Sequence, residues 1–121
     1  MHQGDISPAE AYQRLQNNPS AVLIDVRTQP EWVFVGVPAV ERLIRLSWQV
    51  FPSMQVNGSF VAEIDQMGLP KDAEILCICR SGARSLTATR RLQVAGRVAK
   101  NLRGGMLGWT EAGLPIRRGV E

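Results

Sequence analysis

The residues best suited to chemistry lie in one short stretch, residues 79–85, with the sequence CRSGARS. Cys79 is its potential nucleophile, because a thiolate attacks far better than a thiol. Arg80 and Arg84 add positive charge, and Gly82 lets a tight loop take positive φ angles. A strand-like apolar run precedes the stretch and a helix-like segment follows it, so backbone N–H groups and the positive end of the helix face the sulfur. We expect a loop that favours the thiolate and attracts an anion.

The numbers of histidine and cysteine residues limit the ways in which the Cys79 thiol can be activated. His2 is the only histidine and lies at a terminus, so a positioned Cys–His or Ser–His pair is not expected. The second cysteine, Cys77, lies within the same extended run as Cys79, a poor geometry for a disulfide and too few ligands for structural zinc. Cys77 is therefore interpreted as a core thiol. The sequence predicts electrostatic activation in a reducing compartment, with no metal and no cofactor.

Strands that alternate with helices must position the reactive stretch. We expect strands at residues 21–26, 43–46, 75–78 and 97–102, of which 21–26 and 75–78 are largely apolar. We expect helices at residues 8–17, after a capping box at Ser7, and at residues 29–35, 59–67 and 85–95. Residues 47–58 are interpreted as a loop over the core, or a partner surface, and the last segment as rich in turns. This order predicts an α/β domain with a mainly parallel sheet and helices on both faces.

Length and composition favour one ordinary globular domain over residues 1–121, since 45% of the residues are hydrophobic and 21% are charged. No apolar run approaches the ~20 residues that span a bilayer. The first residues carry neither a basic nor an apolar segment, so we expect a cytoplasmic protein. The net charge of +3 is scattered, without the aromatic-interleaved basic patch of nucleic-acid binders. Neither membrane nor nucleic acid is an expected partner, and anionic small molecules or acidic partners are mildly favoured.

Asp25 is a second candidate for the site. Ligands bind at the carboxyl ends of parallel strands, and both Asp25 and Cys79 stand at such ends, so they could meet in space. A carboxylate at a strand end most often caps N–H groups or pairs with a nearby arginine such as Arg27. We therefore interpret Asp25 and Arg27 as supporting residues.

Three regions together resemble the signatures of the rhodanese family. They are residues 23–27 (LIDVR) with Glu31, residues 79–85 (CRSGARS), and residues 102–105 (LRGG) with Trp109, Gly113 and Pro115. The resemblance runs over almost the whole chain, in order. It implies a three-layer sandwich with a mainly parallel five-stranded sheet, helices on both faces, and an active loop between the fourth strand and its helix. It also implies a single-domain sulfurtransferase.

The resemblance further implies a role for each loop residue. Cys79 would take a sulfane sulfur from a small anionic donor such as thiosulfate and pass it, from a persulfide, to a thiol or protein acceptor. Backbone N–H groups would cradle the sulfur or the departing oxyanion, and Arg84 would stabilise loop and anion. The expected binding residues are Arg80, Ser81, Gly82, Ala83, Arg84 and Ser85. Ser85 is expected to cap the following helix rather than to donate to the sulfur.

Two alternatives remain open at this point. Four residues separate Cys79 from Arg84, whereas related phosphatases and arsenate reductases have five and so a wider cradle for a tetrahedral oxyanion. Such a phosphatase also needs a general acid, and the sequence singles out none. Sulfur is therefore favoured over phosphate. The other alternative is a non-catalytic sulfur carrier or regulatory binding module.

Two departures from the family pattern keep the binding-module alternative open. Family members usually carry Gly-His-Ile-Pro-Gly-Ala after the acidic helix, but residues 36–40 here read GVPAV, without the histidine. The segment at 47–58 is the other departure. We expect its Trp48, Phe51 and Met54 to be buried in packing rather than to line the rim of the pocket. The pair Gly104 and Gly105 is expected to turn the last segment, with little part in chemistry.

Overall fold

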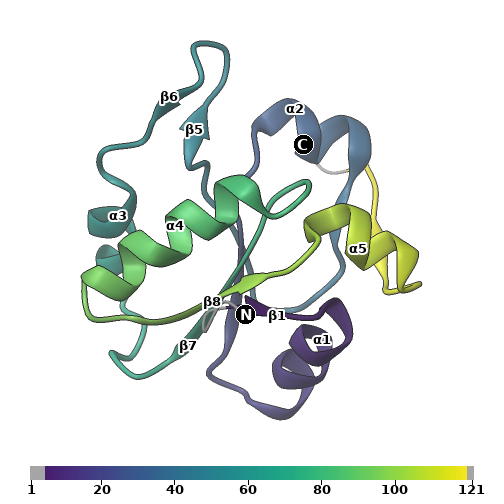
Figure 1. Cartoon of the computed structure of the whole chain (residues 1–121), viewed down its shortest axis with the longest axis horizontal. Coiled ribbons are helices and arrows are strands. Elements are labelled where there is room, and N and C mark those ends of the chain that lie inside the picture. The colour runs from purple at the N-terminus through teal and green to yellow at the C-terminus, as the bar shows by residue number, and fades with distance from the viewer. Residues whose placement is uncertain (1–4, 120–121) are drawn as a thin grey trace.

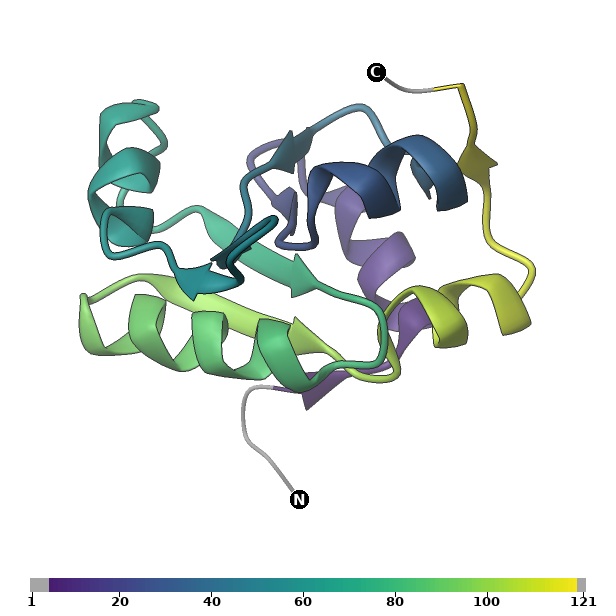
Figure 2. The ribbon, with the colours of Figure 1, turned by 90° about the horizontal axis from the view of Figure 1, so that it is seen from above.

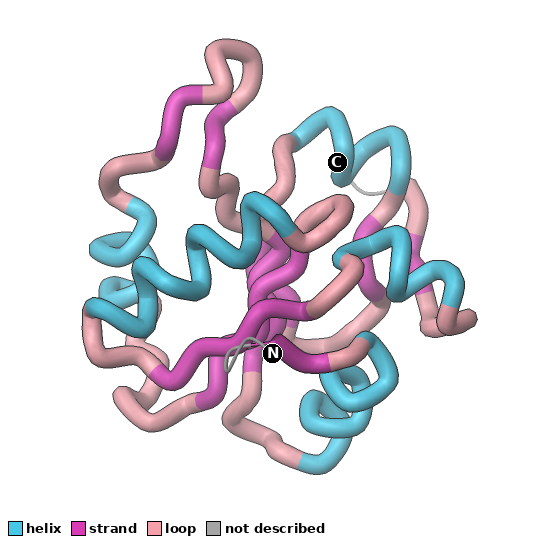
Figure 3. Tube along the Cα trace, in the orientation of Figure 1, coloured by secondary structure: helices cyan, strands magenta, loops and turns pink. Residues whose placement is uncertain are grey.

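The computed structural model describes residues 5–119, so the expectations about His2 and the first residues concern positions outside this range. Five parallel strands form the main sheet in the order β1-β8-β7-β2-β4 (Figure 1). In that order they span Asp5–Ile6, Val98–Leu102, Glu74–Ile78, Val22–Asp25 and Leu43–Arg45. Two small antiparallel pairs are separate from this sheet (Figure 3). They join β3 (Val37–Pro38) to β9 (Ile116–Arg117), and β5 (Gln49–Val50) to β6 (Gln55–Val56).

Helices cover both faces of the sheet (Figure 2). Helices α1 (Pro8–Asn17) and α5 (Gly105–Glu111) pack on one face, where Leu15 and Trp109 contact the sheet residues of one buried cluster. Helices α3 (Phe60–Gln66) and α4 (Ala83–Val94) pack on the other face through a second cluster. Helix α2 (Gln29–Val35) follows β2 and has no buried residue. The three-layer sandwich with a five-stranded parallel sheet is thus confirmed.

Strand β7 and helix α1 form where the pattern predicts them. Ile75, Leu76, Cys77 and Ile78 of β7 are fully buried, because both faces of this central strand are covered by helices. Ser7 caps α1, since its Oγ accepts a hydrogen bond of 3.1 Å from the Glu10 N–H. Continuous apolar runs and capping residues are local signals, so these elements follow from the sequence alone.

Helix α4 begins at Ala83, two residues before the expected start at Ser85. Gly82 occupies the N-cap position in a left-handed conformation, with φ of 109°. Such a backbone suits glycine, and it turns the loop directly into the helix. Ser85 therefore lies in the first turn and does not cap the helix, so that prediction is wrong.

The segments 47–58 and 103–117 contain more regular structure than expected. The first forms the hairpin β5–β6, and the second contains α5 and β9. Trp48 is buried, in edge-to-face contact with Phe60 at 5.3 Å between ring centroids. Phe51 and Met54 are 56% and 37% exposed, so their predicted burial is wrong. They lie near the tip of a hairpin that extends from the core, where no element covers them (Figure 1). Within residues 5–119 the structure has no helix long and apolar enough to cross a membrane.

Candidate active site

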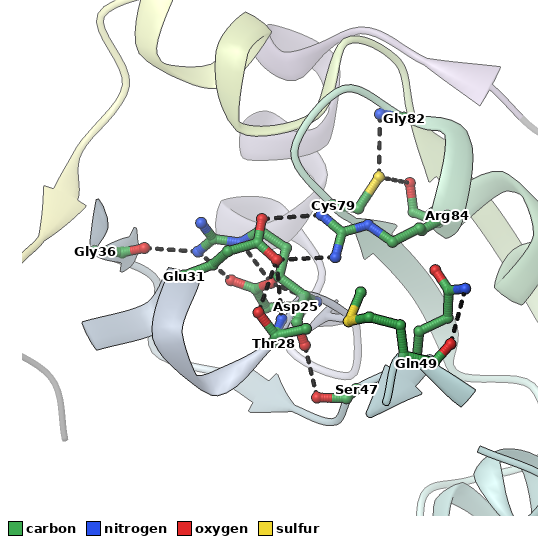
Figure 4. A network of polar contacts seen from close by, with 12 residues as sticks. Asp25, Thr28, Glu31, Gly36, Ser47, Gln49, Cys79, Gly82 and Arg84 are labelled. Carbon is green, nitrogen blue, oxygen red and sulfur yellow. Dashed lines mark hydrogen bonds and ion pairs between the residues drawn. The ribbon is translucent and has the colours of Figure 1, made fainter. Parts of the chain in front are cut away.

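Cys79 directly follows β7, at the carboxyl end of the central strand (Figure 4). Its Sγ accepts a hydrogen bond of 3.1 Å from the Gly82 N–H, and the Ser85 hydroxyl donates to it at 3.2 Å. Only 1% of the residue is exposed. The positive end of α4 is adjacent, so donors and helix dipole both favour a negative charge on this sulfur.

The start of α5 donates hydrogen bonds to two backbone carbonyls of the loop. The Met106 N–H donates to the Cys79 carbonyl at 2.8 Å, and the Leu107 N–H donates to the Arg80 carbonyl at 3.1 Å. Because these two carbonyls accept hydrogen bonds from α5, the Gly82 N–H on the same loop donates to the sulfur instead of to them. A side chain at Gly105 would bring its Cβ to 2.4 Å from the Cys79 carbonyl oxygen. Gly105 therefore permits the contact on which the loop geometry depends, a larger role than the expected turn.

Arg84 is paired with a carboxylate of α2. Its two terminal nitrogens donate to the Glu31 oxygens at 2.8 and 2.9 Å, and the Thr28 N–H and hydroxyl also donate to Glu31 (Figure 4). Burial alone would raise the pKa of Glu31, but the hydrogen bonds from Arg84 and Thr28 lower it to about 2. The same pair raises the pKa of Arg84. The pair links the active loop to α2, and Glu31 balances part of the charge that was expected to stabilise an anion.

Asp25 and Arg27 form a buried ion pair of their own. Arg27 donates to the two Asp25 oxygens at 2.9 and 2.7 Å, and it also donates to the Gly36 carbonyl at 2.6 Å. Asp25 lies opposite Ile78 in the register between β2 and β7, one residue before Cys79. The predicted pairing of Asp25 with Arg27 is confirmed. It fixes the end of β2 and the turn after α2, both beside the loop.

The remaining loop residues face solvent. Arg80, Ser81 and Ala83 are exposed, and among residues 5–119 the Arg80 guanidinium makes no hydrogen bond or ion pair. Arg80 is therefore available to an incoming anion. Cys77 is fully buried, and this burial raises the pKa of its thiol to about 12. The interpretation of Cys77 as an unreactive core thiol agrees with this environment.

Asn101 is a site residue that sequence reasoning missed. It lies on β8, is 3% exposed, and has its amide oxygen 2.5 Å from the Ser85 hydroxyl. Its amide nitrogen donates to the Gly82 carbonyl at 3.2 Å and to Asp5 Oδ1 at 3.3 Å. The available signal was an asparagine inside an apolar strand, since a buried amide must find partners.

Comparison with known proteins agrees with this geometry. A family model for the rhodanese-like domain matches residues 7–112. The chain belongs to this family. A sulfurtransferase from Allochromatium vinosum is 33% identical over 114 residues, which cover 93% of this chain and 92% of that protein. Thiosulfate sulfurtransferase 18 from Arabidopsis thaliana is 35% identical over 101 residues, or 81% of this chain and 73% of that protein.

A crystal structure of a protein from M. tuberculosis superposes on this rhodanese-like chain with a TM-score of 0.83 at 34% identity, over 97% of this chain and 98% of the other. The resemblance drawn from three short regions is thus confirmed over most of the chain. Sulfurtransferases among the relatives support a transferase activity with a sulfur donor and a sulfur acceptor.

Proposed function

We propose that this rhodanese-like domain is a thiosulfate-type sulfurtransferase that carries the transferred sulfur as a persulfide on Cys79. The observation that carries the proposal is the donor set around Cys79 Sγ, formed by the Gly82 N–H and the Ser85 hydroxyl at the start of α4. The name of the Arabidopsis thaliana relative supports thiosulfate as the donor. A reducing compartment such as the cytoplasm would keep Cys79 available.

In the first half-reaction the Cys79 thiolate attacks the sulfane sulfur of thiosulfate. A sulfur–sulfur bond forms to Cys79, the bond between the two sulfurs of thiosulfate breaks, and sulfite leaves with the electron pair. Loop N–H groups and the exposed Arg80 stabilise the charge that accumulates on the departing sulfite. Cys79 is left as a persulfide, whose outer sulfur carries the negative charge.

In the second half-reaction a thiolate acceptor attacks the outer sulfur of the persulfide. The bond between that sulfur and Cys79 breaks, and the electron pair returns to Cys79 Sγ. The donors from Gly82 and Ser85 stabilise this returning thiolate, just as they stabilise the attacking one. Sulfur transfer thus needs no general acid or base at the loop.

Phosphate ester hydrolysis fits the site less well. A leaving alcohol requires a proton from a nearby acid, but the carboxylates of Asp25 and Glu31 beside the loop are engaged, Asp25 with Arg27 and Glu31 with Arg84. The pKa of Glu31, lowered to about 2, keeps this group ionised at neutral pH and unable to give a proton. The arrangement therefore favours sulfur transfer over phosphatase chemistry.

Mass spectrometry of the intact protein after thiosulfate treatment tests the proposal. We expect a gain of about 32 Da, the mass of one sulfur, that a reducing agent removes. Cys79→Ser should abolish this gain, and the matched control Cys77→Ser should keep it. Absence of the adduct in the wild type would overturn the proposal.

Two further assays separate the alternatives. Formation of thiocyanate from thiosulfate and cyanide over many turnovers identifies an enzyme. Loading of a single sulfur without turnover identifies a carrier or regulatory module. Hydrolysis of an aryl phosphate by the wild type, and not by Cys79→Ser, would instead favour a phosphatase.

A further inference from the structure

Large apolar side chains are exposed on both elements that flank the active loop. Figures 1 and 2 show α2 and the hairpin β5–β6 at the end of the molecule where the loop between β7 and α4 lies. Phe34 is 84% exposed and Phe51 is 56% exposed. We call the following set the apolar rim: Val33, Phe34 and Val35 of α2, and Val50, Phe51, Met54 and Val56 of the hairpin. A cluster of exposed apolar residues beside a reactive group is typical of an interaction surface.

The α2 part of the rim is placed next to the loop by Glu31. This carboxylate faces the Arg84 guanidinium at 2.8 Å. Residues three and four positions further along a helix lie on the same face, so Phe34 and Val35 share the side of α2 that carries Glu31. The most exposed aromatic residue of the rim therefore lies on the side of α2 that approaches the active loop.

Contacts at its base and on β6 position the hairpin part of the rim near the active site. Figure 4 draws Gln49 among the residues around the active loop, and the Ser47 hydroxyl at the base of the hairpin donates to the Arg27 carbonyl at 2.7 Å. Val56 pairs directly with Gln49 across the hairpin, so both side chains lie on the same face. Val56 also lines a small hollow with Trp48 and Arg91 of α4. The hairpin part of the rim thus lies beside α4, the helix that follows the active loop.

The surface around the rim carries positive charge. Residues 75–110, which include the active loop and α4, contain seven basic residues and no aspartate or glutamate, and two of the seven, Arg84 and Arg97, are paired with Glu31 and Asp65. Arg80, Arg90 and Arg91 are exposed, whereas the nearby Glu31 is neutralised by Arg84. A partner that matches this surface combines apolar side chains with acidic ones.

We infer that the apolar rim and its flanking arginines dock a protein sulfur acceptor, which presents its thiol among acidic and apolar residues. This inference rests on the proposed function, because it names the acceptor of the persulfide. A small thiol needs no apolar rim, and Cys79 is only 1% exposed, so a protein acceptor must present its thiol on a segment narrow enough to reach the loop. The rim is mainly aliphatic, and aliphatic side chains fit apolar residues of a protein better than stacked bases.

A pair of matched peptides tests the docking surface. One contains a cysteine flanked by leucine and glutamate residues, and in the other lysine replaces each glutamate. We first replace the cysteine of both by serine and titrate them into the unmodified protein, following backbone amide shifts by NMR. The acidic peptide should shift resonances of α2 and the hairpin and bind at least about tenfold more tightly, with weaker binding at high salt.

Substitutions inside and outside the apolar rim then show which residues contribute to peptide binding. The double substitution Phe34→Ser/Phe51→Ser should weaken binding of the acidic peptide about tenfold, since exposed aromatic anchors carry much of such interfaces. Val94→Ser is the matched control, because Val94 is 87% exposed but ends α4 at the far side from the loop. Equal binding of both peptides, or equal effects of the two variants, would overturn the inference. Tighter binding of a thiol-free RNA oligonucleotide at the same rim would also overturn it.

Sulfur transfer from loaded protein to the cysteine peptides completes the test. The rim variant should slow transfer to the acidic peptide about tenfold and leave transfer to free cysteine unchanged. The binding titration does not require a persulfide, so it can succeed where sulfur loading fails. Failure of loading would therefore count against the proposed function, and failure of the titration against the docking surface.

Discussion

Ser85 and Asn101 are joined by a hydrogen bond of 2.5 Å, and the same Ser85 hydroxyl lies 3.2 Å from the Cys79 sulfur. A hydroxyl carries one proton, so Ser85 cannot donate to both acceptors at once. When the sulfur is a neutral thiol, it can donate to Ser85 while Ser85 donates to Asn101. When the sulfur is a thiolate, the Ser85 proton turns to the sulfur. Ser85 can therefore hydrogen-bond to the Cys79 sulfur in either charge state.

Replacement of Ser85 by alanine should slow both sulfur loading and alkylation of Cys79 about tenfold at neutral pH. The reason is the loss of one of two donors, since a hydrogen bond to a charged group contributes about 1.5–3 kcal/mol. Stopped-flow alkylation with iodoacetamide gives the rate. Thr87→Ala, an exposed hydroxyl on the same helix, serves as the control. Equal rates for wild type and Ser85→Ala would show that the hydroxyl does not support the thiolate.

Asn101 should act through the loop rather than on substrate. Asn101→Ala removes the bond to the Gly82 carbonyl at 3.2 Å and the second partner of Ser85, so we expect transfer to slow about tenfold. Its effect should be clearly smaller in the Ser85→Ala background, because residues of one network are not additive.

Asn57→Ala is the control for Asn101→Ala. The Asn57 amide also bonds a backbone carbonyl and a side chain, those of Ser47 and Glu63. Asn57→Ala should lower stability without changing transfer rate. Full additivity of the Asn101→Ala and Ser85→Ala substitutions would contradict the proposed coupling between these residues.

Local signals explain why so much of the fold could be predicted. The helix after Ser7 and the strand before Cys79 depend on a cap and an apolar run, and both are visible in a few residues. The hairpin at 49–56 was missed because its two short strands carry no buried face, and so no periodic pattern. Asn101 was missed because its partners, Gly82 and Ser85, come from another element and meet it only in the folded sheet.

The pair between Glu31 and Arg84 should make stability depend on pH. Hydrogen bonds from Arg84 and Thr28, which overcome the cost of burial, lower the pKa of Glu31 from 4.5 to about 2, so the folded state holds the proton less tightly than the unfolded state. The stabilisation is therefore fully present above pH 4.5 and is lost as the pH falls through about 2. Glu31→Gln should cost about 1–2 kcal/mol at neutral pH, since the pair is partly exposed, and almost nothing near pH 2.

Urea unfolding of wild type and Glu31→Gln at several pH values measures this difference. Glu10→Gln provides the comparison, because Glu10 pairs with Arg14 on an exposed helix face and is 49% exposed. Its substitution should cost less at every pH. A cost for Glu31→Gln that does not change with pH would mean that packing, rather than charge, stabilises the contact between α2 and the loop.

Gly105 should tolerate no side chain. Alanine there would place its Cβ 2.4 Å from the Cys79 carbonyl oxygen and 2.5 Å from that of Arg80, and both are backbone atoms that cannot rotate away. The hydrogen bonds from Met106 and Leu107 to these carbonyls would be displaced. We expect Gly105→Ala to destabilise the fold by about 3 kcal/mol or more, and any folded fraction to lose sulfur loading.

Gly113→Ala isolates the backbone cost, because Gly113 has φ of 73° but no atom within 4 Å of the added Cβ. Gly113→Ala should lower the free energy of unfolding by only about 1 kcal/mol and leave sulfur loading intact. Similar losses of stability and loading in both variants would show that the contact between α5 and the active loop is not what makes Gly105 necessary.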